Sequence, residues 1–195
     1  MIGRSVSSWL LIRVGWRPPS TQTSDGERRC LARHAAGRRR IVEIGVYHGA
    51  NTALLRSVVA PDGEVIGIDP HAPGRLGLSF ERWIAERQLS RVRRGRARLI
   101  QQYSHDAAAT WTAPIDFLFI DGDHSWSGIA RDWSEWSGHI EQQGLVALHD
   151  SRHVDGREDL DSVRFTRDVI HRDERFEVID EVESLTVLRR RSGRC

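Results

Sequence analysis

Short runs of apolar residues alternate along the chain with longer segments in which apolar residues recur every three or four positions. The short runs predict β-strands buried on both faces, and the longer segments predict amphipathic helices. The predicted strands cover residues 39–45, 64–69, 97–102, 115–121, 144–150, 176–182 and 184–190. The predicted helices cover residues 49–60, 80–89, 104–111, 125–140 and 160–172. This alternation predicts an α/β fold with a doubly wound, mostly parallel sheet.

The last two predicted strands follow each other without a helix between them. They meet at Glu183, which predicts a tight turn and a β-hairpin at the end of the sheet. The length of 195 residues suits one domain with a sizeable core. We therefore expect a single Rossmann-like domain, with an N-terminal helical cap over residues 1–38 and the core over residues 39–195.

The helix predicted over residues 125–140 is strongly amphipathic. Ser125 precedes it and is a suitable N-cap. Helical spacing places five apolar side chains along one face: Trp126, Ile129, Trp133, Trp136 and Ile140. We expect these tryptophans to pack in the core rather than to take part in chemistry.

The charge is nearly balanced at +2, yet every basic residue is arginine and the chain contains no lysine. Schiff-base chemistry and a lysine general base are therefore excluded. Arginines crowd in residues 87–98 and 189–194. A nucleic-acid surface is one interpretation of these runs. A solvated surface is favoured, because no aromatic side chains are interleaved for base stacking, and we expect no nucleic-acid partner.

No apolar run approaches the roughly 18 residues that a membrane span requires, so we expect no membrane partner. The opening MIGRSVSSWLLIRVGW resembles a signal peptide, but Arg13 interrupts its apolar stretch and no small-residue cleavage site follows. A helix that packs on the domain is favoured there. Cys30 and Cys195 form neither a disulfide framework nor a metal-ligand spacing, which indicates a reducing cytoplasm.

The loop after the first strand reads EIGVYHGANT, residues 43–52. Gly45 permits a tight turn, and Gly49 lets the start of the helix approach a ligand closely. The spacing G-x-x-x-G differs from the dinucleotide fingerprint G-x-G-x-x-G, which disfavours a pyrophosphate-binding dehydrogenase. Asp69 ends the second strand, where a carboxylate can accept hydrogen bonds from ribose hydroxyls. The alternative is an ordinary loop followed by an unrelated aspartate.

The chain resembles class I S-adenosylmethionine-dependent methyltransferases over nearly its whole length, at EIGVYHGANT, VIGIDP and FIDGDHSW…GLVALHD. It is most similar to small O-methyltransferases of the catechol and caffeoyl-CoA type, to metal-dependent macrolide sugar O-methyltransferases and to relatives of cephalosporin hydroxylases. The resemblance implies a seven-stranded sheet whose hairpin contributes one antiparallel strand. It implies S-adenosylmethionine as the cofactor, with these residues binding it: Glu43, Gly45, Tyr47, Gly49, Asn51, Asp69, Ser104 and Asp121. In this set Asp69 would hold the ribose and Ser104 would lie by the adenine.

Polar residues follow the apolar run of FLFIDGDHSWSG, residues 117–128. In the resembling families the first acid after this strand is a metal ligand, and Asp121 holds that position. The next strand ends in His149-Asp150-Ser151. Neighbouring strands lie about 4.8 Å apart, so groups at their ends can meet at one ion. We expect Asp121 and Asp150 to bind Mg²⁺ or Mn²⁺, with His149 or Ser151 as third ligand. The alternative is that both carboxylates only cap helices or face solvent.

Methyl transfer to a hydroxyl requires a base for the hydroxyl proton. The resembling enzymes place a lysine or a histidine three residues after the first metal acid, and this chain has His124 there. A neutral imidazole, whose ordinary pKa is about 6.5, suits this task near pH 7. We expect His124 to be the catalytic base, with Asp123 able to tune either His124 or the ion.

Two other functions compete with an O-methyltransferase. The first is a protein of this fold that binds S-adenosylmethionine without transferring the methyl group, or that uses the site for a different reaction. The second is a nucleic-acid methyltransferase recruited by the arginines, although the Asn/Asp-Pro-Pro-aromatic segment used on base amino groups is missing. The expected acceptor is a hydroxyl of a small molecule, a sugar or another natural product. The sequence leaves open whether the chain forms a homo-oligomer.

Overall fold

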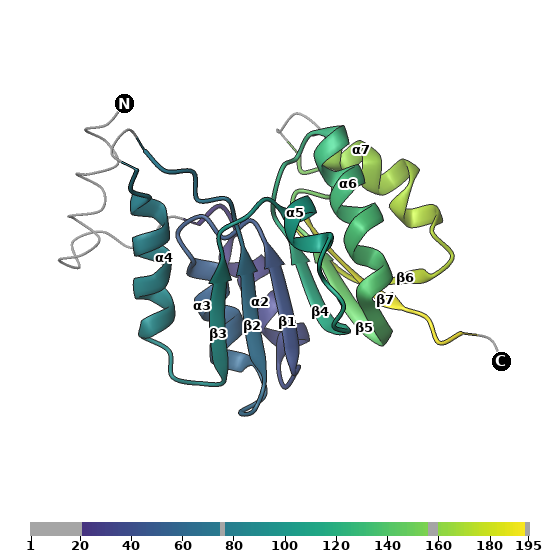
Figure 1. Ribbon diagram of the computed structural model, residues 1–195. Helices are drawn as coiled ribbons and strands as arrows, with labels where there is room; N and C mark the ends of the chain where they lie inside the picture. Colours follow the sequence, from purple (N-terminus) through teal and green to yellow (C-terminus); the bar gives the residue numbers. More distant parts are fainter. Residues whose placement is uncertain (1–20, 75–76, 156–159, 194–195) are drawn as a thin grey trace.

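The computed structural model describes residues 21–74, 77–155 and 160–193 (Figure 1). Its sheet has seven strands in the order β3-β2-β1-β4-β5-β7-β6. Their bounds are β1 Arg40–Ile44, β2 Glu64–Ile68, β3 Arg96–Ile100, β4 Ile115–Ile120, β5 Ile140–Leu148, β6 Phe176–Val182 and β7 Leu185–Arg190. Only β7 runs antiparallel to its neighbours, β5 and β6, while the other pairs are parallel. The predicted sheet and its C-terminal hairpin are confirmed.

Helices cover both faces of the sheet (Figure 1). Their bounds are α2 Asp25–Ala35, α3 Ala50–Val58, α4 Phe80–Ser90, α5 Ser104–Ala108, α6 Trp126–Trp136 and α7 Asp161–Asp168. Apolar side chains of α5, α6 and α7 pack in one core cluster with one face of the sheet, and those of α2 and α3 pack in a second cluster with the other face. Strand β4 is buried at every position, as its continuous apolar run predicts. None of the described helices has the length and hydropathy of a membrane span.

The helix predicted over residues 125–140 is shorter than expected. It ends at Trp136, a 3₁₀ turn covers Ser137–His139, and Ile140 already opens β5. Ser137 and Gly138 are weak helix formers, and Ile140 pairs with Ile115 of β4, so strand pairing prevails over the helical pattern. The Ser125 cap is confirmed, because its side chain accepts a hydrogen bond from the Gly128 amide.

One tryptophan of this helix departs from the expected core packing. Trp133 and Trp136 are buried, but Trp126 is 42 % exposed and meets Phe165 of α7 edge-on. Trp126 occupies the first turn of α6, where the helix rises above the end of the sheet. The prediction that Trp126 belongs to the core is therefore wrong. The N-terminal helix expected within residues 1–16 and the terminal Cys195 lie outside the described residues.

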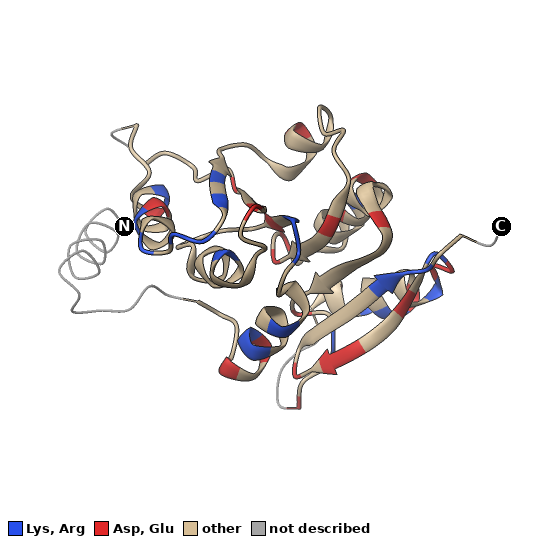
Figure 2. Cartoon of the chain, turned by 90° about the horizontal axis from the view of Figure 1, so that it is seen from below, with Lys and Arg blue, Asp and Glu red and all other residues tan. Residues whose placement is uncertain are grey.

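Two arginines, Arg56 of α3 and Arg94 of the 87–98 region, tie loops together at the N-terminal ends of the strands. Arg56 donates hydrogen bonds to the carbonyl oxygens of Leu89, Arg94 and Gly95, and Arg94 donates to that of Val59. Figure 2 shows basic and acidic residues interspersed over the cartoon. Arg94 of the 87–98 region therefore has a structural role, which the expectation of a simple solvated surface did not include.

Candidate functional site

A cavity of about 670 Å³ lies at the C-terminal ends of β1, β2 and β4. In open α/β sheets this end of the strands is the usual place for a ligand. Among the predicted site residues, the cavity is lined by Gly45, Tyr47, Asn51, Asp69, Ser104, Asp121 and His124. Glu43, Gly49, His149 and Asp150 are not among the lining residues. The structure thus brings the cofactor loop and the first predicted metal acid, Asp121, to one cavity, while Asp150 lies outside its lining.

Asp69 fixes the conformation of the loop after β1. One carboxylate oxygen accepts hydrogen bonds from the backbone amides of Val46 and Tyr47, both at 2.9 Å. The other accepts from the His71 amide at 2.7 Å, and the His71 ring lies 3.0 Å from the Tyr47 carbonyl oxygen. A carboxylate offers about four acceptor positions, so three amides leave room for one more donor. Asp69 therefore shapes the loop as well as facing the cavity.

Glycine is required at positions 45 and 49 of the loop for different structural reasons. Gly45 has φ of +87°, and a Cβ there would lie 2.1 Å from the Asp121 carbonyl oxygen, so glycine alone lets the loop touch the end of β4. Gly49 has φ of +73°, and its Cβ would lie 2.8 Å from the backbone of Ala85 in α4. Glycine at position 49 is therefore required for the close packing of α3 on α4, and its closeness to a ligand stays a prediction.

Glu43 lies in β1 below the loop and is almost completely buried, at 1 % exposure. Within the described part of the chain, neither of its carboxyl oxygens has a hydrogen-bond partner. Burial raises the pKa of Glu43 well above its ordinary value. The neighbouring Thr52 hydroxyl acts in the opposite direction and favours the charged carboxylate, but burial dominates.

Ser104 and Asp132 form a pair on the opposite wall of the cavity. The Ser104 hydroxyl donates to the Asp132 carboxylate at 2.5 Å, and both residues line the cavity. Burial raises the pKa of Asp132 to about 6. Sequence reasoning missed Asp132, because its position on α6 predicts only a polar residue beside the tryptophan face.

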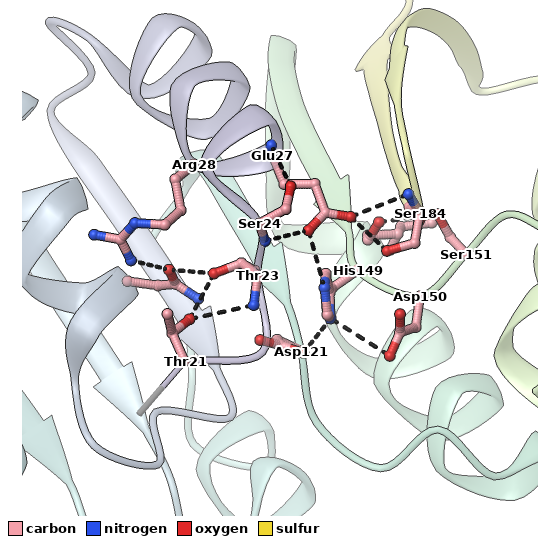
Figure 3. A network of polar contacts seen from close by, with 12 residues as sticks. Thr21, Thr23, Ser24, Glu27, Arg28, Asp121, His149, Asp150, Ser151 and Ser184 are labelled. Carbon is pink, nitrogen blue, oxygen red and sulfur yellow. Dashed lines mark hydrogen bonds and ion pairs between the residues drawn. The ribbon is translucent and has the colours of Figure 1, made fainter. Parts of the chain in front are cut away.

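His149 stands at the centre of a buried polar network (Figure 3). Its Nδ1 lies 2.8 Å from Asp121 Oδ1, and its Nε2 lies 3.5 Å from Glu27 Oε2 on helix α2. Burial alone would lower the pKa of His149, but the contacts with Asp121, Glu27 and Asp150 raise it to about 10. Burial would raise the pKa of Glu27, yet His149 and Ser184 lower it to about 2. Glu27 is a site residue that sequence reasoning missed, since 122 residues of chain separate it from its partner.

His124 lies between the two predicted metal acids. Its Nε2 is 3.6 Å from Asp121 Oδ1, and its Nδ1 is 3.8 Å from Asp150 Oδ2. Among the described residues, Nε2 has no hydrogen-bond partner. Asp150 has φ of +47°, an unusual conformation for a residue other than glycine, which directs its side chain toward the site. The histidine and both acids predicted from separate strands therefore meet.

Ser151, the alternative third metal ligand, belongs to a different network. Its buried hydroxyl lies 2.8 Å from Thr186 Oγ1 and within hydrogen-bond distance of the carbonyl oxygens of Leu148 and Ser184. One ligand atom each from Asp121, His124 and His149 lie within 4.8 Å of one another, so this group could hold a cation. Because both nitrogens of His149 already face carboxylates, His149 is a poorer donor for a cation than the carboxylates of Asp121 and Asp150.

The segment that leads into α2 closes one wall of the cavity (Figure 3). Thr21 and Gln22 line the cavity, and Thr23 donates its hydroxyl hydrogen to Asn51 Oδ1 at 2.9 Å. Arg28 donates to the same oxygen at 2.8 Å. The predicted Asn51 is thus held in place from the N-terminal side, a contact that the local sequence around residue 51 does not reveal.

The chain was compared with known proteins. The methyltransferase domain family matches residues 42–151. Tricin synthase 1 of Oryza sativa subsp. japonica is 31% identical over 91 residues, which are 45% of this chain and 36% of that enzyme. The chain thus aligns with little more than a third of the length of this curated relative.

Solved structures give the same picture of the fold. Cofactor-bound Rv0187 from MTB superposes with a TM-score of 0.69 at 18% identity, covering 97% of this chain and 91% of that one. The O-methyltransferase from Bacillus cereus in complex with SAH gives a TM-score of 0.61 at 18% identity, covering 96% and 91%. At these identities the likeness concerns the fold.

Proposed function

Because the chain belongs to the methyltransferase domain family, we propose that it is an S-adenosylmethionine-dependent O-methyltransferase acting on a hydroxyl of a small molecule. The observation that carries the proposal is the position of His124 between Asp121 and Asp150, at the wall of the cavity that the Gly45 loop opens into. A histidine that lines the cavity and stands between two carboxylates is suited to take a hydroxyl proton.

The cavity fits the cofactor in three respects. Its volume of about 670 Å³ lies in the range of small-molecule sites. The Glu43 carboxyl group is buried in β1 next to the Gly45 loop and outside the cavity lining, so the α-ammonium group of a bound amino acid would interact with it through a water. Asp69 keeps one acceptor position for a ribose hydroxyl, and the Ser104–Asp132 pair can contact the adenine. When bound, S-adenosylmethionine supplies a methyl group on a sulfonium sulfur.

His124 and its neighbours handle the proton. The imidazole accepts the proton of the acceptor hydroxyl, and the carboxylates of Asp121 and Asp150 stabilise the imidazolium that results. The contact between His149 and Asp121 fixes the orientation of that carboxylate, and Glu27 in turn fixes His149. In this proposal Glu27, His149 and Asp121 together hold the His124 base in one position. This lowers the entropy cost of aligning the base with the acceptor hydroxyl.

Asp121 and Asp150 are also the proposed ligands of Mg²⁺ or Mn²⁺. Their carboxylates lie on either side of His124, and oxygen donors suit hard divalent ions. When bound, the ion supplies Lewis-acid polarisation of the acceptor oxygen. Both nitrogens of His149 face carboxylates. In this proposal His149 therefore orients Asp121 and is not itself a metal ligand.

The acceptor is proposed to be a sugar or another natural product with an apolar or aromatic part. Tyr47 and Tyr103 line the cavity and are 45 % and 58 % exposed, so their rings offer open contact surface to such a molecule. We place the reaction in the cytoplasm, with no nucleic-acid or membrane partner, and leave homo-oligomer formation to measurement.

Two measurements on the purified chain test the function. Calorimetry with S-adenosylmethionine should give saturable binding, and mass spectrometry of a library of hydroxylated acceptors with Mg²⁺ or Mn²⁺ should find products heavier by one methylene unit. Binding without any methylated product, in a library that includes sugars and catechols, would favour the binding protein without transferase activity. Absence of binding would contradict the proposal. Methylation of RNA or DNA instead would favour a nucleic-acid enzyme.

A further inference from the structure

A second cluster of potential ligands lies away from the cavity, between helix α2 and the edge strand β6. Cys30 and His34 project from α2, and Asp180 projects from β6. His34 Nε2 lies 2.7 Å from Asp180 Oδ2, and Cys30 Sγ lies 3.5 Å from the same oxygen. One ligand atom from each of the three residues lies within 4.8 Å of the other two. The spacing along the sequence hides this group, because Asp180 comes from the far end of the chain.

The three donors have the chemistry of a zinc site. Residues four apart on a helix share one face, so Cys30 and His34 point the same way. A thiolate, an imidazole and a carboxylate bind Zn²⁺ at about 2.0–2.3 Å, which places ligand atoms of one ion roughly 3–4 Å apart. The Asp180 oxygen lies 2.7 Å from His34 Nε2 and 3.5 Å from Cys30 Sγ, and all three ligand atoms lie within 4.8 Å of one another, close to this range. Cys30 is 2 % exposed while the other two side chains are partly open, so an ion has an entrance from the solvent side.

Arg33 marks the place that a cation would take. Its guanidinium group donates to Asp180 Oδ2 and lies 3.8 Å from Cys30 Sγ, so a positive group already contacts two of the three donors. The Arg33 side chain is 63 % exposed. It can therefore turn into solvent when a metal ion replaces it, at little cost because exposed ion pairs contribute little.

We propose that Cys30, His34 and Asp180 bind Zn²⁺, with water completing the tetrahedron. The site would fasten α2 to β6. Helix α2 also carries Glu27, which contacts His149 and the Ser184 hydroxyl. The ion would thus stabilise the helix that supports the polar network of the cavity, without touching the reacting atoms. This inference does not depend on the proposed methyl transfer.

Cobalt spectroscopy on the full chain tests the site. Co²⁺ replaces Zn²⁺ in such sites, and a cysteine ligand produces a thiolate-to-cobalt charge-transfer absorption that oxygen and nitrogen ligands do not. Titration of the wild-type chain should produce this absorption, saturating at one equivalent, and added Zn²⁺ should remove it. The acids and histidines around Asp121 include no cysteine, so a cation bound there does not contribute to the signal.

Matched variants assign the ligand. Cys30→Ser should lose the absorption, while Cys195→Ser, which removes the chain's other cysteine, should keep it. Asp180→Asn and His34→Gln should weaken Co²⁺ binding more than tenfold, and circular dichroism checks that each variant is folded. If Cys30→Ser does not fold, these two variants decide. An absent absorption in the wild type, an absorption that survives Cys30→Ser, or unchanged affinity in folded Asp180→Asn would overturn the proposal.

Discussion

His149 Nδ1 lies 2.8 Å from Asp121 Oδ1, and this short contact joins the ends of two neighbouring strands of the sheet. Glu27, on the other side of the imidazole, extends the chain of contacts to helix α2. Asp121 lines the cavity, whereas His149 and Glu27 do not, so the position of the Asp121 carboxylate depends on groups outside the cavity lining. The predictions below separate these supporting groups from the groups proposed to act on the acceptor.

Removal of divalent metal should stop methyl transfer and leave cofactor binding largely in place. The reason is that Asp121 and Asp150 flank His124, while the Gly45 loop and Asp69 line another part of the cavity. Turnover and S-adenosylmethionine affinity are measured before and after chelation, with Mg²⁺ or Mn²⁺ added back. Asp150→Ala should behave like the chelated enzyme. Full turnover in excess chelator would contradict the role of the ion.

Asp69→Ala should weaken S-adenosylmethionine binding by about 1.5–3 kcal/mol, the range for hydrogen bonds to a charged group. Both the ribose contact and the conformation of the Val46–Tyr47 loop are lost in this variant. Calorimetry measures the dissociation constant. Asp62→Ala is the control, because Asp62 is exposed and forms an ion pair with Arg39 at the other end of β2. Equal affinities for both variants would show that Asp69 is not part of the cofactor site.

Asp132 should make stability depend on pH. Its folded pKa of about 6 exceeds the ordinary 3.8, so the folded state holds the proton more tightly than the unfolded chain. The stabilisation is fully present below pH 3.8 and is lost as pH rises through 6. Relative to wild type, Asp132→Asn should gain about 2 kcal/mol of unfolding free energy between pH 4 and pH 7. Urea unfolding at several pH values measures this difference, and parallel curves for the two proteins would contradict the burial effect.

Arg56→Ala should lower the free energy of unfolding by about 1–3 kcal/mol, because one guanidinium group holds three carbonyl oxygens of the α4–β3 region. Arg93→Ala, which removes an exposed arginine of the same region, should change it by less than about 0.5 kcal/mol. Urea denaturation compares the two. Similar losses of unfolding free energy in both variants would mean that these arginines act through their positive charge rather than through the hydrogen bonds of Arg56.

The sequence predicts the sheet well because β4 and its neighbours are continuous apolar runs that only a buried strand satisfies. The meeting of Asp121, His124 and Asp150 also follows, since all three stand at the C-terminal ends of adjacent strands. The contact of Glu27 with His149 cannot be predicted from the sequence, because no local pattern shows that helix α2 packs near the end of β5.

Backbone geometry also limits what the sequence predicts about the loop after β1. Asp69 was expected to face only a ribose, yet its oxygens also accept backbone amides of residues 46, 47 and 71. The direction of these amides depends on positive φ angles at Gly45 and Tyr47, which the order of residues does not specify. For the same reason the steric role of Gly49 against Ala85 emerges only from the packing of α3 on α4.

The central claim is that His124 takes the proton of the acceptor hydroxyl, and the rate of methyl transfer by His124→Ala tests it most directly. The account predicts a decrease of roughly 10²–10⁴-fold in turnover, with metal and S-adenosylmethionine affinities unchanged. His171→Ala, which removes an exposed histidine outside the cavity, serves as the control and should keep the wild-type rate. A His124→Ala enzyme with the wild-type rate would contradict the account, and one that loses the metal ion would make His124 a ligand instead of the base.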